Sequence, residues 1–302
     1  MILKIDRKAL TAITLRAFLR QQGFSQALWR KLKHNGVVTV NGIPVNLSRT
    51  ILSPTDEIMI FLNEKSNIIP QNIPLDICYE DEYFLAVNKP ANLLVHPVGA
   101  EKYNTLGNAI LYYYQQKNEL SAFHPMHRLD RNTTGLVLIA KHPNIQHIMT
   151  TGAKKMFSRK YIAIISGKIA PENGTIDLPV SRQDGSIIKH QVSENGKSAL
   201  TNYNTLSSTA NGEYSLLQLS LETGRTHQIR VHLSYLGHPL LGDDLYGGNH
   251  NLINRQALHA YKICFYHPVS EKEITITAPV PKDFLRLLSD LNLKPKNESI
   301  FF

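Results

Sequence analysis

The chain has 302 residues, and its composition, 42% hydrophobic and 19% charged, excludes a generally disordered protein. No stretch approaches the roughly 20 apolar residues that span a bilayer, and the N-terminal stretch scatters its charges unlike a secretory signal. Cys78 and Cys264 lie far apart and the 13 histidines show no zinc-site spacing, so we expect neither disulfides nor a metal site. These features predict a cytoplasmic protein with reduced thiols and with no metal or cofactor.

Positive charge is concentrated at the N-terminal end of the chain. Residues 1–62 contain nine Lys and Arg residues against three acidic ones, and so hold six of the nine net positive charges. Clustered positive charge in a small folded unit indicates a polyanionic partner, of which nucleic acid is the commonest. The alternative is a basic surface that is merely solvated.

This basic segment has the pattern of two short helices followed by a small antiparallel sheet. Apolar residues recur at helical spacing in two groups, Leu15, Phe18 and Leu19, and then Leu28, Trp29 and Leu32. Ser25 stands where it can cap the second helix. Asn41-Gly42 interrupts an apolar run and predicts a hairpin, and residues 58–62 supply a further strand after a turn at Ser53-Pro54.

From Leu15 to Leu62 the segment resembles the RNA-binding module named after a small-subunit ribosomal protein. The Ser25 cap, the basic second helix and the run Gly-Val-Val-Thr-Val-Asn-Gly at 36–42 carry this resemblance. It implies that the second helix, with Arg30, Lys31 and Lys33, and the hairpin grip structured RNA. The alternative is a helical hairpin that only supports the next domain.

The rest of the chain reads as a second, larger domain. Residues 65–74 carry two prolines and no helical or strand period, so we divide the chain into a domain at 1–64, a linker at 65–74 and a domain at 75–302. Candidate strands of the larger domain are residues 84–88, 136–140, 161–166, 214–221, 258–266 and 274–278. Candidate helices are residues 105–115, 145–155, a segment after Thr226, and 284–291. The strands do not alternate regularly with helices, which argues against a doubly wound parallel sheet and for an α+β domain.

Residues 127–140 hold the first candidate for chemistry. Polar residues that include Asp130 end in Gly135 and run directly into a continuous apolar strand, so Asp130 is expected on a loop braced by that strand. Arg128 and Arg131 flank it and would keep its carboxylate ionised, as a nucleophile or a base requires. The alternative is an aspartate that only organises a turn.

Two further stretches place basic and aromatic residues beside strands. In residues 222–233, Ile229, Leu233 and the later Leu236 keep helical spacing, while Arg230 lies outside that set and could hold a carboxylate. The alternative for Arg230 is a phosphate contact at the surface. Tyr161 follows Arg159 and Lys160 at the start of a strand, where it could stack on a base or simply pack.

Together these stretches resemble the RluA-type family of RNA pseudouridine synthases over nearly the whole chain. The matching motifs, in order, are Asn88-Lys89-Pro90 with residues 94–97, then residues 127–135, Lys160-Tyr161, residues 224–233 and residues 237–243. A mild departure is Thr134, where many members have Ser. The resemblance implies a mixed, largely antiparallel sheet in the larger domain.

The resemblance also implies the reaction and the residues that perform it. Uracil is detached from its ribose, turned, and rejoined through carbon 5, an isomerisation that needs no cofactor. Asp130 would be the catalytic nucleophile or base, Tyr161 would stack on the uracil and help to remove the carbon-5 proton, and Arg230 would pair with Asp130. Arg128 would hold the space left by the flipped uridine, because chemistry on a base takes it out of the stack.

Three alternatives to a ribosomal RNA pseudouridine synthase are considered. Family members with the N-terminal module often act on large-subunit ribosomal RNA, but others modify transfer RNA. A non-catalytic RNA-binding or ribosome-assembly protein would lack Asp130, Tyr161 or Arg230, and all three are present. An RNA glycosidase would release free uracil. Since no unexplained apolar helix face stands out, a monomer is expected.

Overall fold

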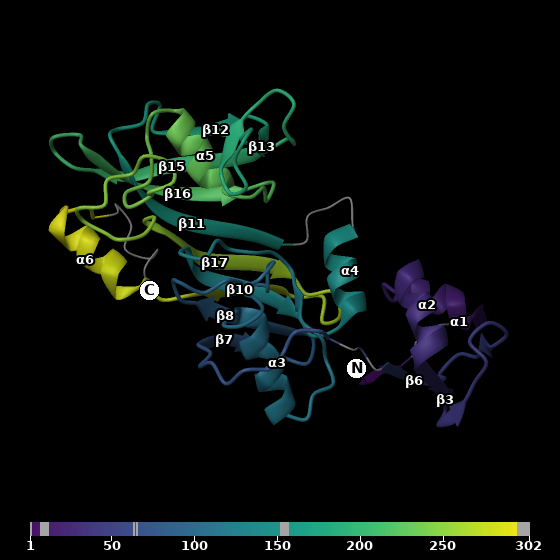
Figure 1. Cartoon of the computed structure of the whole chain (residues 1–302). Helices are drawn as coiled ribbons and strands as arrows, with labels where there is room; N and C mark the ends of the chain where they lie inside the picture. Colours follow the sequence, from purple (N-terminus) through teal and green to yellow (C-terminus); the bar gives the residue numbers. More distant parts are fainter. Residues whose placement is uncertain (1, 7–11, 63, 65, 152–156, 295–302) are drawn as a thin grey trace.

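The computed structural model describes residues 2–6, 12–62, 64, 66–151 and 157–294. Figure 1 shows a large domain built on one broad sheet and, beside it, a small module formed by the N-terminal part of the chain. In the described part of the chain, no helix is long and apolar enough to cross a membrane.

The N-terminal module has the helix–helix–sheet order predicted from the sequence. Its helices are α1 (Leu15–Gln21) and α2 (Gln26–Asn35), and the Ser25 hydroxyl accepts a hydrogen bond from the Leu28 amide at 3.1 Å, which confirms the predicted cap. The four-stranded antiparallel sheet has the order β1 (Ile2–Asp6), β6 (Glu57–Leu62), β3 (Gly36–Val40) and β4 (Ile43–Pro44). A separate strand pair joins β2 (Ile13–Thr14) to β5 (Ile51–Leu52).

The predicted Asn-Gly hairpin joins β3 to β4. Asn41 and Gly42 have φ angles of 50° and 80°, the left-handed backbone that a two-residue hairpin turn requires. The six apolar residues picked out by helical spacing all lie in the buried cluster of the module, at Leu15, Phe18, Leu19, Leu28, Trp29 and Leu32. Strand β1 was not predicted from the sequence.

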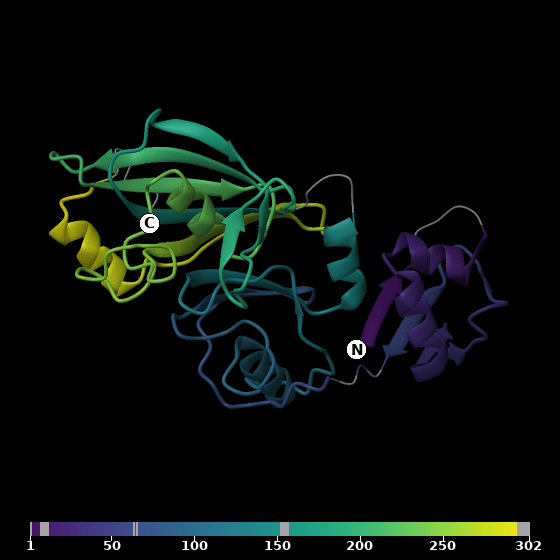
Figure 2. The ribbon, with the colours of Figure 1, turned by 45° about the horizontal axis from the view of Figure 1, so that its top comes forward.

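The module lies against helix α4 (Pro143–Thr151) of the large domain, as Figures 1 and 2 show from two directions. The Asn144 side-chain amide donates to the Gln22 carbonyl at 3.1 Å, and His124 lies 3.0 Å from Glu64. At Gly23, with φ of 78°, an added Cβ would lie 2.3 Å from the Ile148 side chain. The glycine therefore permits close approach of the module to α4.

The proline-containing segment at 65–74 has neither helix nor strand among its described residues, as predicted, but it does not run free of the domain. The Gln71 amide donates to the Asn108 carbonyl at 3.0 Å, and the Asn108 side chain donates to the Ile69 carbonyl at 2.7 Å. Ile68 packs on the main core. The segment is thus attached to helix α3 (Leu106–Gln116), while the division at 64 and 74 stays a prediction.

The large domain is a mixed, mostly antiparallel sheet, which confirms the predicted fold class. Its strand order is β12 (Asn173–Asp177), β15 (Leu200–Ser208), β16 (Tyr214–Leu221), β11 (Phe157–Ser166), β17 (Leu258–Tyr266), β10 (Thr134–Ala140), β8 (Phe84–Lys89) and β7 (Ile77–Glu80). In addition, β18 (Glu273–Thr277) pairs with β17, and β9 (His124–Pro125) pairs with β10. The pairing of β10 with β17 is parallel, whereas the other pairings in this sheet are antiparallel.

Helices and a short hairpin complete the large domain. Besides α3 and α4 these are α5 (Gln228–Tyr235), α6 (Lys282–Asp290) and the hairpin of β13 (Val180–Arg182) with β14 (His190–Val192). The predicted helices are present with ends that differ by a few residues, and residues 152–155 of the helix predicted at 145–155 lie outside the described residues. The predicted strands are present too, and strands that were not predicted include β7, β12 and β15. In β15 the buried Thr201, Tyr203 and Thr205 alternate with more polar neighbours, so hydrophobicity alone does not reveal the strand.

Strand β10 supports the candidate loop as predicted. All seven of its residues are buried, and the loop that contains Asp130 enters directly into it. Gly135 stands where β10 meets β17, with φ of 112°, and a Cβ there would lie 2.2 Å from the Ala260 carbonyl oxygen. Because backbone fills that space, only glycine fits.

Gly135→Ala should therefore destabilise the fold by about 3 kcal/mol, since it adds both backbone strain and overlap at the centre of the sheet. The matched control is Gly212→Ala. Gly212 also has positive φ, 71°, but nothing lies within 4 Å of its added Cβ. The control should be destabilised by about 1 kcal/mol from the φ strain alone. Urea unfolding of both variants tests the difference, and equal destabilisation would contradict it.

Candidate active site

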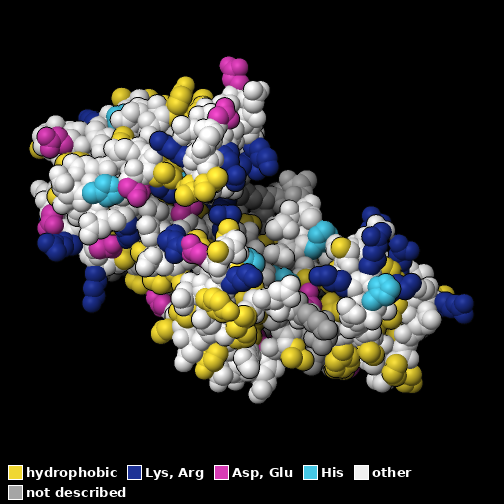
Figure 3. Space-filling model, in the orientation of Figure 1, with side chains coloured by type: hydrophobic (Ala, Val, Ile, Leu, Met, Phe, Trp, Pro, Cys, Tyr) yellow, Lys and Arg dark blue, Asp and Glu magenta, His cyan; other side chains and the backbone are white. Residues whose placement is uncertain are grey.

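A cleft of about 760 Å³ lies where the loop before β10 meets the start of α5. Its lining includes residues 94–98 and Ile188, which lies between strands β13 and β14. Its polar lining includes Asp130, His227 and Arg230. In Figure 3, Lys and Arg side chains surround the centre of this face of the large domain, with hydrophobic side chains between them.

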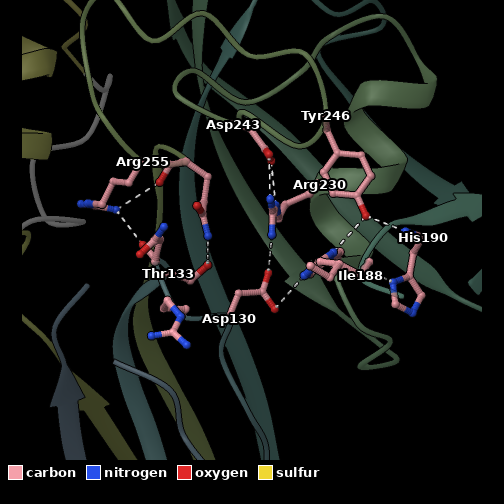
Figure 4. A network of polar contacts seen from close by, with 12 residues as sticks. Asp130, Thr133, Ile188, His190, Arg230, Asp243, Tyr246 and Arg255 are labelled. Carbon is pink, nitrogen blue, oxygen red and sulfur yellow. Dashed lines mark hydrogen bonds and ion pairs between the residues drawn. The ribbon is translucent and has the colours of Figure 1, made fainter. Parts of the chain in front are cut away.

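The Asp130 carboxylate is approached by a different group on each of its oxygens (Figure 4). Arg230 Nη1 donates to Oδ2 at 3.3 Å, and His227 Nε2 lies 3.8 Å from Oδ1. The Thr133 amide donates to the Asp130 carbonyl at 3.1 Å and closes the turn that carries the side chain. The structure therefore brings together Asp130 and Arg230, which lie 100 residues apart in the sequence.

Arg230 is held mainly by a second carboxylate. Its Nε and Nη2 donate to the two oxygens of Asp243 at 2.7 Å each, and the Asp243 side chain is fully buried. Burial acts against the charge of Arg230, but the hydrogen bonds and charge of Asp243, with a smaller contribution from Asp130, raise its pKa above the usual value. In the sequence Asp243 stood out only as part of a turn motif. Its role as the partner of Arg230 was not predicted, because no local pattern pairs a turn aspartate with a helical arginine.

The flanking arginines do not hold Asp130, contrary to the expectation from the sequence. Arg131 forms an ion pair with Glu101 instead. Arg128 is exposed and lines the cleft. Among the described residues, the Asp130 carboxylate forms an ion pair with Arg230, and the His227 ring lies 3.8 Å from its other oxygen. The partner that holds the carboxylate is Arg230 of α5.

Tyr161 lies beside Asp130 in an adjoining hollow of about 210 Å³, whose walls also include Arg128 and Arg159. Burial raises the pKa of the Tyr161 hydroxyl, while the nearby Arg159 guanidinium acts in the opposite direction. The hydroxyl is therefore protonated at neutral pH. Arg159 is itself buried, and its Nε has no hydrogen-bond partner within the described part of the chain.

Lys89 fixes the other end of the Asp130 loop. Its fully buried ammonium group donates to the carbonyls of Pro90, Leu93 and Arg131 at 2.8 to 2.9 Å. Three carbonyl acceptors satisfy the three donors of an ammonium group. Lys89 therefore ties the strand β8 to the loop that carries Asp130, a role that its place in the sequence motif did not reveal.

Arg30, Lys31 and Lys33 lie exposed on α2, in the module and not at the cleft. Figure 3 shows the basic side chains gathered over the upper part of the module. The structure adds a second hollow there, of about 620 Å³, between the module and α4. It is lined by residues that include Arg16, Arg20, Trp29 and His147, and the Arg16 guanidinium lies 5.8 Å from the centre of the Trp29 ring.

No cluster of three or more His, Cys, Asp or Glu side chains suited to a metal ion occurs among the residues that the structure describes. The absence of a metal and of a cofactor stays a prediction. The groups that the site does present are a carboxylate, a buried guanidinium, a neutral phenol and an imidazole, which suit nucleophilic or acid–base chemistry.

Three comparisons with known proteins, by family model, by sequence and by structure, all find similarity to the same family. A family model described as RNA pseudouridylate synthase matches residues 83–235. The chain is 42% identical to an uncharacterized RNA pseudouridine synthase of Bacillus subtilis, over 80% of this chain and 81% of that protein. It is 40% identical to the ribosomal large subunit pseudouridine synthase D of Haemophilus ducreyi, over 85% of this chain and 83% of the relative. The human RNA pseudouridylate synthase domain containing 4 has a similar structure, with a TM-score of 0.59 and 26% identity over 74% of this chain and 95% of that one.

The buried pair of Arg230 and Asp243 predicts a stability effect. Asp243→Asn should lower the free energy of unfolding by about 3 kcal/mol, because it leaves a buried guanidinium short of its main counter-charge. Adding Arg230→Met should restore part of that stability, since it removes the unpaired charge. Urea unfolding of both single variants and the double variant measures the coupling. Effects that simply add would show that the two side chains do not stabilise each other.

Proposed function

Because the chain belongs to the RNA pseudouridine synthase family, of the RluA type, whose members isomerise uridine in RNA, we propose that it modifies specific uridines of large-subunit ribosomal RNA through Asp130. The observation that carries the proposal is the Asp130 carboxylate in the cleft, 3.3 Å from a buried guanidinium and next to Tyr161. A carboxylate that faces a cleft and is oriented by a guanidinium can act as nucleophile or base.

The reaction breaks one bond, forms another and moves protons. The bond from N1 of uracil to the ribose breaks, a bond from carbon 5 to the ribose forms, the carbon-5 hydrogen leaves as a proton, and N1 gains a proton. Asp130 starts the sequence as a nucleophile or a base. Arg230 orients its carboxylate, because a guanidinium presents donors in a fixed plane.

Tyr161 contributes the contact with the uracil base. Its raised pKa keeps the phenol neutral, which favours stacking on the base over removal of the carbon-5 proton in the resting enzyme. Tyr161 and Asp130 both line the adjoining hollow. A uracil that stacks on Tyr161 would therefore lie next to the Asp130 carboxylate.

Arg128 has a place suited to the space that the flipped uridine leaves. It is exposed and lines both the cleft and the Tyr161 hollow, so its side chain can reach RNA without disturbing the fold. When the uridine leaves the base stack, the bases above and below it lose their stacking contact, and another group must fill the gap between them. A long cationic side chain supplies one and also meets the phosphate charge.

Ribosomal RNA is favoured as substrate by two observations. Several relatives from Haemophilus and Vibrio species, 36–40% identical to this chain, are named ribosomal large subunit pseudouridine synthase D. The module also carries an exposed basic surface at Arg30, Lys31 and Lys33, apart from the cleft, which suits capture of a large structured RNA.

Mapping of pseudouridines across all cellular RNA, with and without the gene, tests the proposal. We expect pseudouridines in large-subunit ribosomal RNA to disappear when the gene is removed and to return when it is restored. An effect confined to transfer RNA would replace the proposed substrate class. An unchanged map would favour a non-catalytic RNA-binding protein.

Asp130→Asn should abolish pseudouridine formation and leave RNA affinity within about threefold of wild type, because phosphate contacts supply most of the affinity. The matched control is Asp290→Asn, an exposed aspartate on α6 that should retain wild-type activity. A single-turnover assay with purified proteins is the measurement. Substantial product from Asp130→Asn would remove this carboxylate from the chemistry.

Replacing Arg30, Lys31 and Lys33 together by Gln should weaken binding of structured RNA and make it less sensitive to salt. For every RNA phosphate that the protein no longer neutralises, the slope of log affinity against log salt falls by about 0.7 to 0.9. A control with Lys168, Lys282 and Arg286 replaced by Gln removes the same charge from exposed positions of the large domain. Filter binding at several salt concentrations measures the slopes. Equal slopes for the two triple variants would show that the module surface has no special part in binding.

A further inference from the structure

The His227 ring lies between the Asp130 carboxylate and the Tyr246 hydroxyl, and the reaction described above gives it no part. Its Nε2 is 3.8 Å from Asp130 Oδ1, and its Nδ1 is 2.9 Å from the Tyr246 oxygen. Only 11% of the side chain is exposed. The ring is thus enclosed, and both of its nitrogens face defined groups.

The backbone of His227 is also unusual. It has φ of 57°, in the left-handed region, at the residue that precedes α5. Positive φ is uncommon outside glycine, although Asn, Asp and His adopt it several times more often than other residues, and it is often found at functional sites. The side chain makes no capping hydrogen bond to the helix. The ring instead lies at the cleft, beside Asp130.

The hydrogen bonds of Tyr246 determine which nitrogen of the ring is protonated. The backbone amide of His190 donates to the Tyr246 oxygen at 2.9 Å, and an amide can only donate. The hydroxyl proton of Tyr246 needs an acceptor of its own, and among the described contacts His227 Nδ1, at 2.9 Å, supplies it. In the neutral ring the remaining proton is on Nε2, the nitrogen that faces Asp130. Burial lowers the pKa of His227, so the ring is neutral at neutral pH.

Asp130 needs a second anchor because Arg230 is shared. Two of the guanidinium nitrogens of Arg230 donate to Asp243 at 2.7 Å, and only the longer contact of 3.3 Å reaches Asp130. One long contact on Oδ2 leaves the carboxylate free to rotate. His227 approaches the other oxygen, so the two groups together can define the carboxylate plane.

We propose that His227 is a positioning residue whose neutral Nε2–H, in the tautomer set by Tyr246, holds Oδ1 of Asp130 in the orientation that attack on the uridine requires. The inference rests on the proposed role of Asp130. A small rotation of the carboxylate closes the 3.8 Å separation to a hydrogen bond, as catalytic contacts commonly tighten when substrate binds. The Tyr246 ring also lies against the guanidinium of Arg230, 5.0 Å from its centre, so one residue supports both partners of Asp130.

Two substitutions at position 227 separate positioning from folding. His227→Asn keeps a group near Nδ1 and tolerates the left-handed backbone, but removes the donor toward Asp130. His227→Gln places an amide N–H close to the position of Nε2. We expect His227→Asn to lower the single-turnover rate roughly ten- to hundredfold, with little change in RNA affinity, and His227→Gln to recover part of the rate.

Tyr246→Phe tests the tautomer, because it keeps the ring against Arg230 and removes only the hydroxyl. The groups that face His227 and influence its charge are Asp130, Asp243, Arg230, His190 and Tyr246. The Tyr246 hydroxyl stabilises the neutral ring, so its removal raises the pKa of His227. Because the neutral ring is the active form, the acid limb of the rate profile should move to higher pH. Tyr235→Phe, at an exposed tyrosine of α5, should leave the profile unchanged.

The measurement is tritium release from an unmodified transcript of large-subunit ribosomal RNA that carries tritium at carbon 5 of uridine. Thermal unfolding and filter binding of each variant accompany it. If the wild-type protein releases no tritium from this transcript, the proposed function fails with this RNA. If wild type is active and His227→Asn matches it, or if Tyr246→Phe leaves the acid limb in place, the positioning role alone is wrong. A parallel decrease of activity and of thermal stability in His227→Asn would likewise replace positioning by a structural role.

Discussion

The site depends on one buried guanidinium between two carboxylates. A charge removed from water must be paired, and Arg230 satisfies this demand with two short hydrogen bonds to Asp243 and one longer bond to Asp130. Asp243 lies in the turn after α5 and is fully buried, so the arginine cannot leave without exposing a second charge to apolar surroundings. The carboxylate that faces the cleft is the less tightly bound of the two, which leaves it available for chemistry.

The sheet brings these groups to one place. Strand β10 begins after the Asp130 loop, β16 ends before the turn that leads to α5, and β11 carries Tyr161 between them in the strand order. The parallel contact of β10 with β17 requires Gly135, because backbone atoms of Ala260 occupy the space of a side chain. The three segments, which are distant in sequence, thus meet beside the loop that carries Asp130. Lys89 connects a fourth segment, strand β8, to the same loop.

The division of labour between the two parts of the chain follows from charge and attachment. The module carries most of the net positive charge but none of the groups in the cleft. It is attached to the large domain through Gln22, Gly23 and Glu64, and the segment that follows is hydrogen-bonded along α3. A surface that binds RNA phosphates at a defined distance from the cleft would restrict which uridines can reach Asp130.

Local patterns in the sequence determined the local structure. The helical spacing of apolar residues, the Ser25 cap and the Asn41-Gly42 turn each depend on neighbours within a few residues, and each prediction is confirmed. The buried strand after Asp130 was equally visible, because a continuous apolar run reports burial whatever it packs against. The resemblance to the family supplied the pairing of Asp130 with Arg230, which spacing alone could not.

Apart from the pairing of Asp130 with Arg230 that the resemblance supplied, the partners of the buried polar groups were decided by the tertiary structure. Arg131 stands next to Asp130 in the chain yet pairs with Glu101, while Arg230 and His227 reach Asp130 from about 100 residues away. Nothing local marks Asp243 as the main partner of Arg230 or Tyr246 as the partner of His227. The proline-containing segment looked like a free linker because its hydrogen bonds are with Asn108 of α3, which lies more than 30 residues further along the chain. The physical reason is the same in each case: backbone preference acts over a few residues, whereas a buried charge or hydroxyl is satisfied by whichever group the folded sheet places beside it.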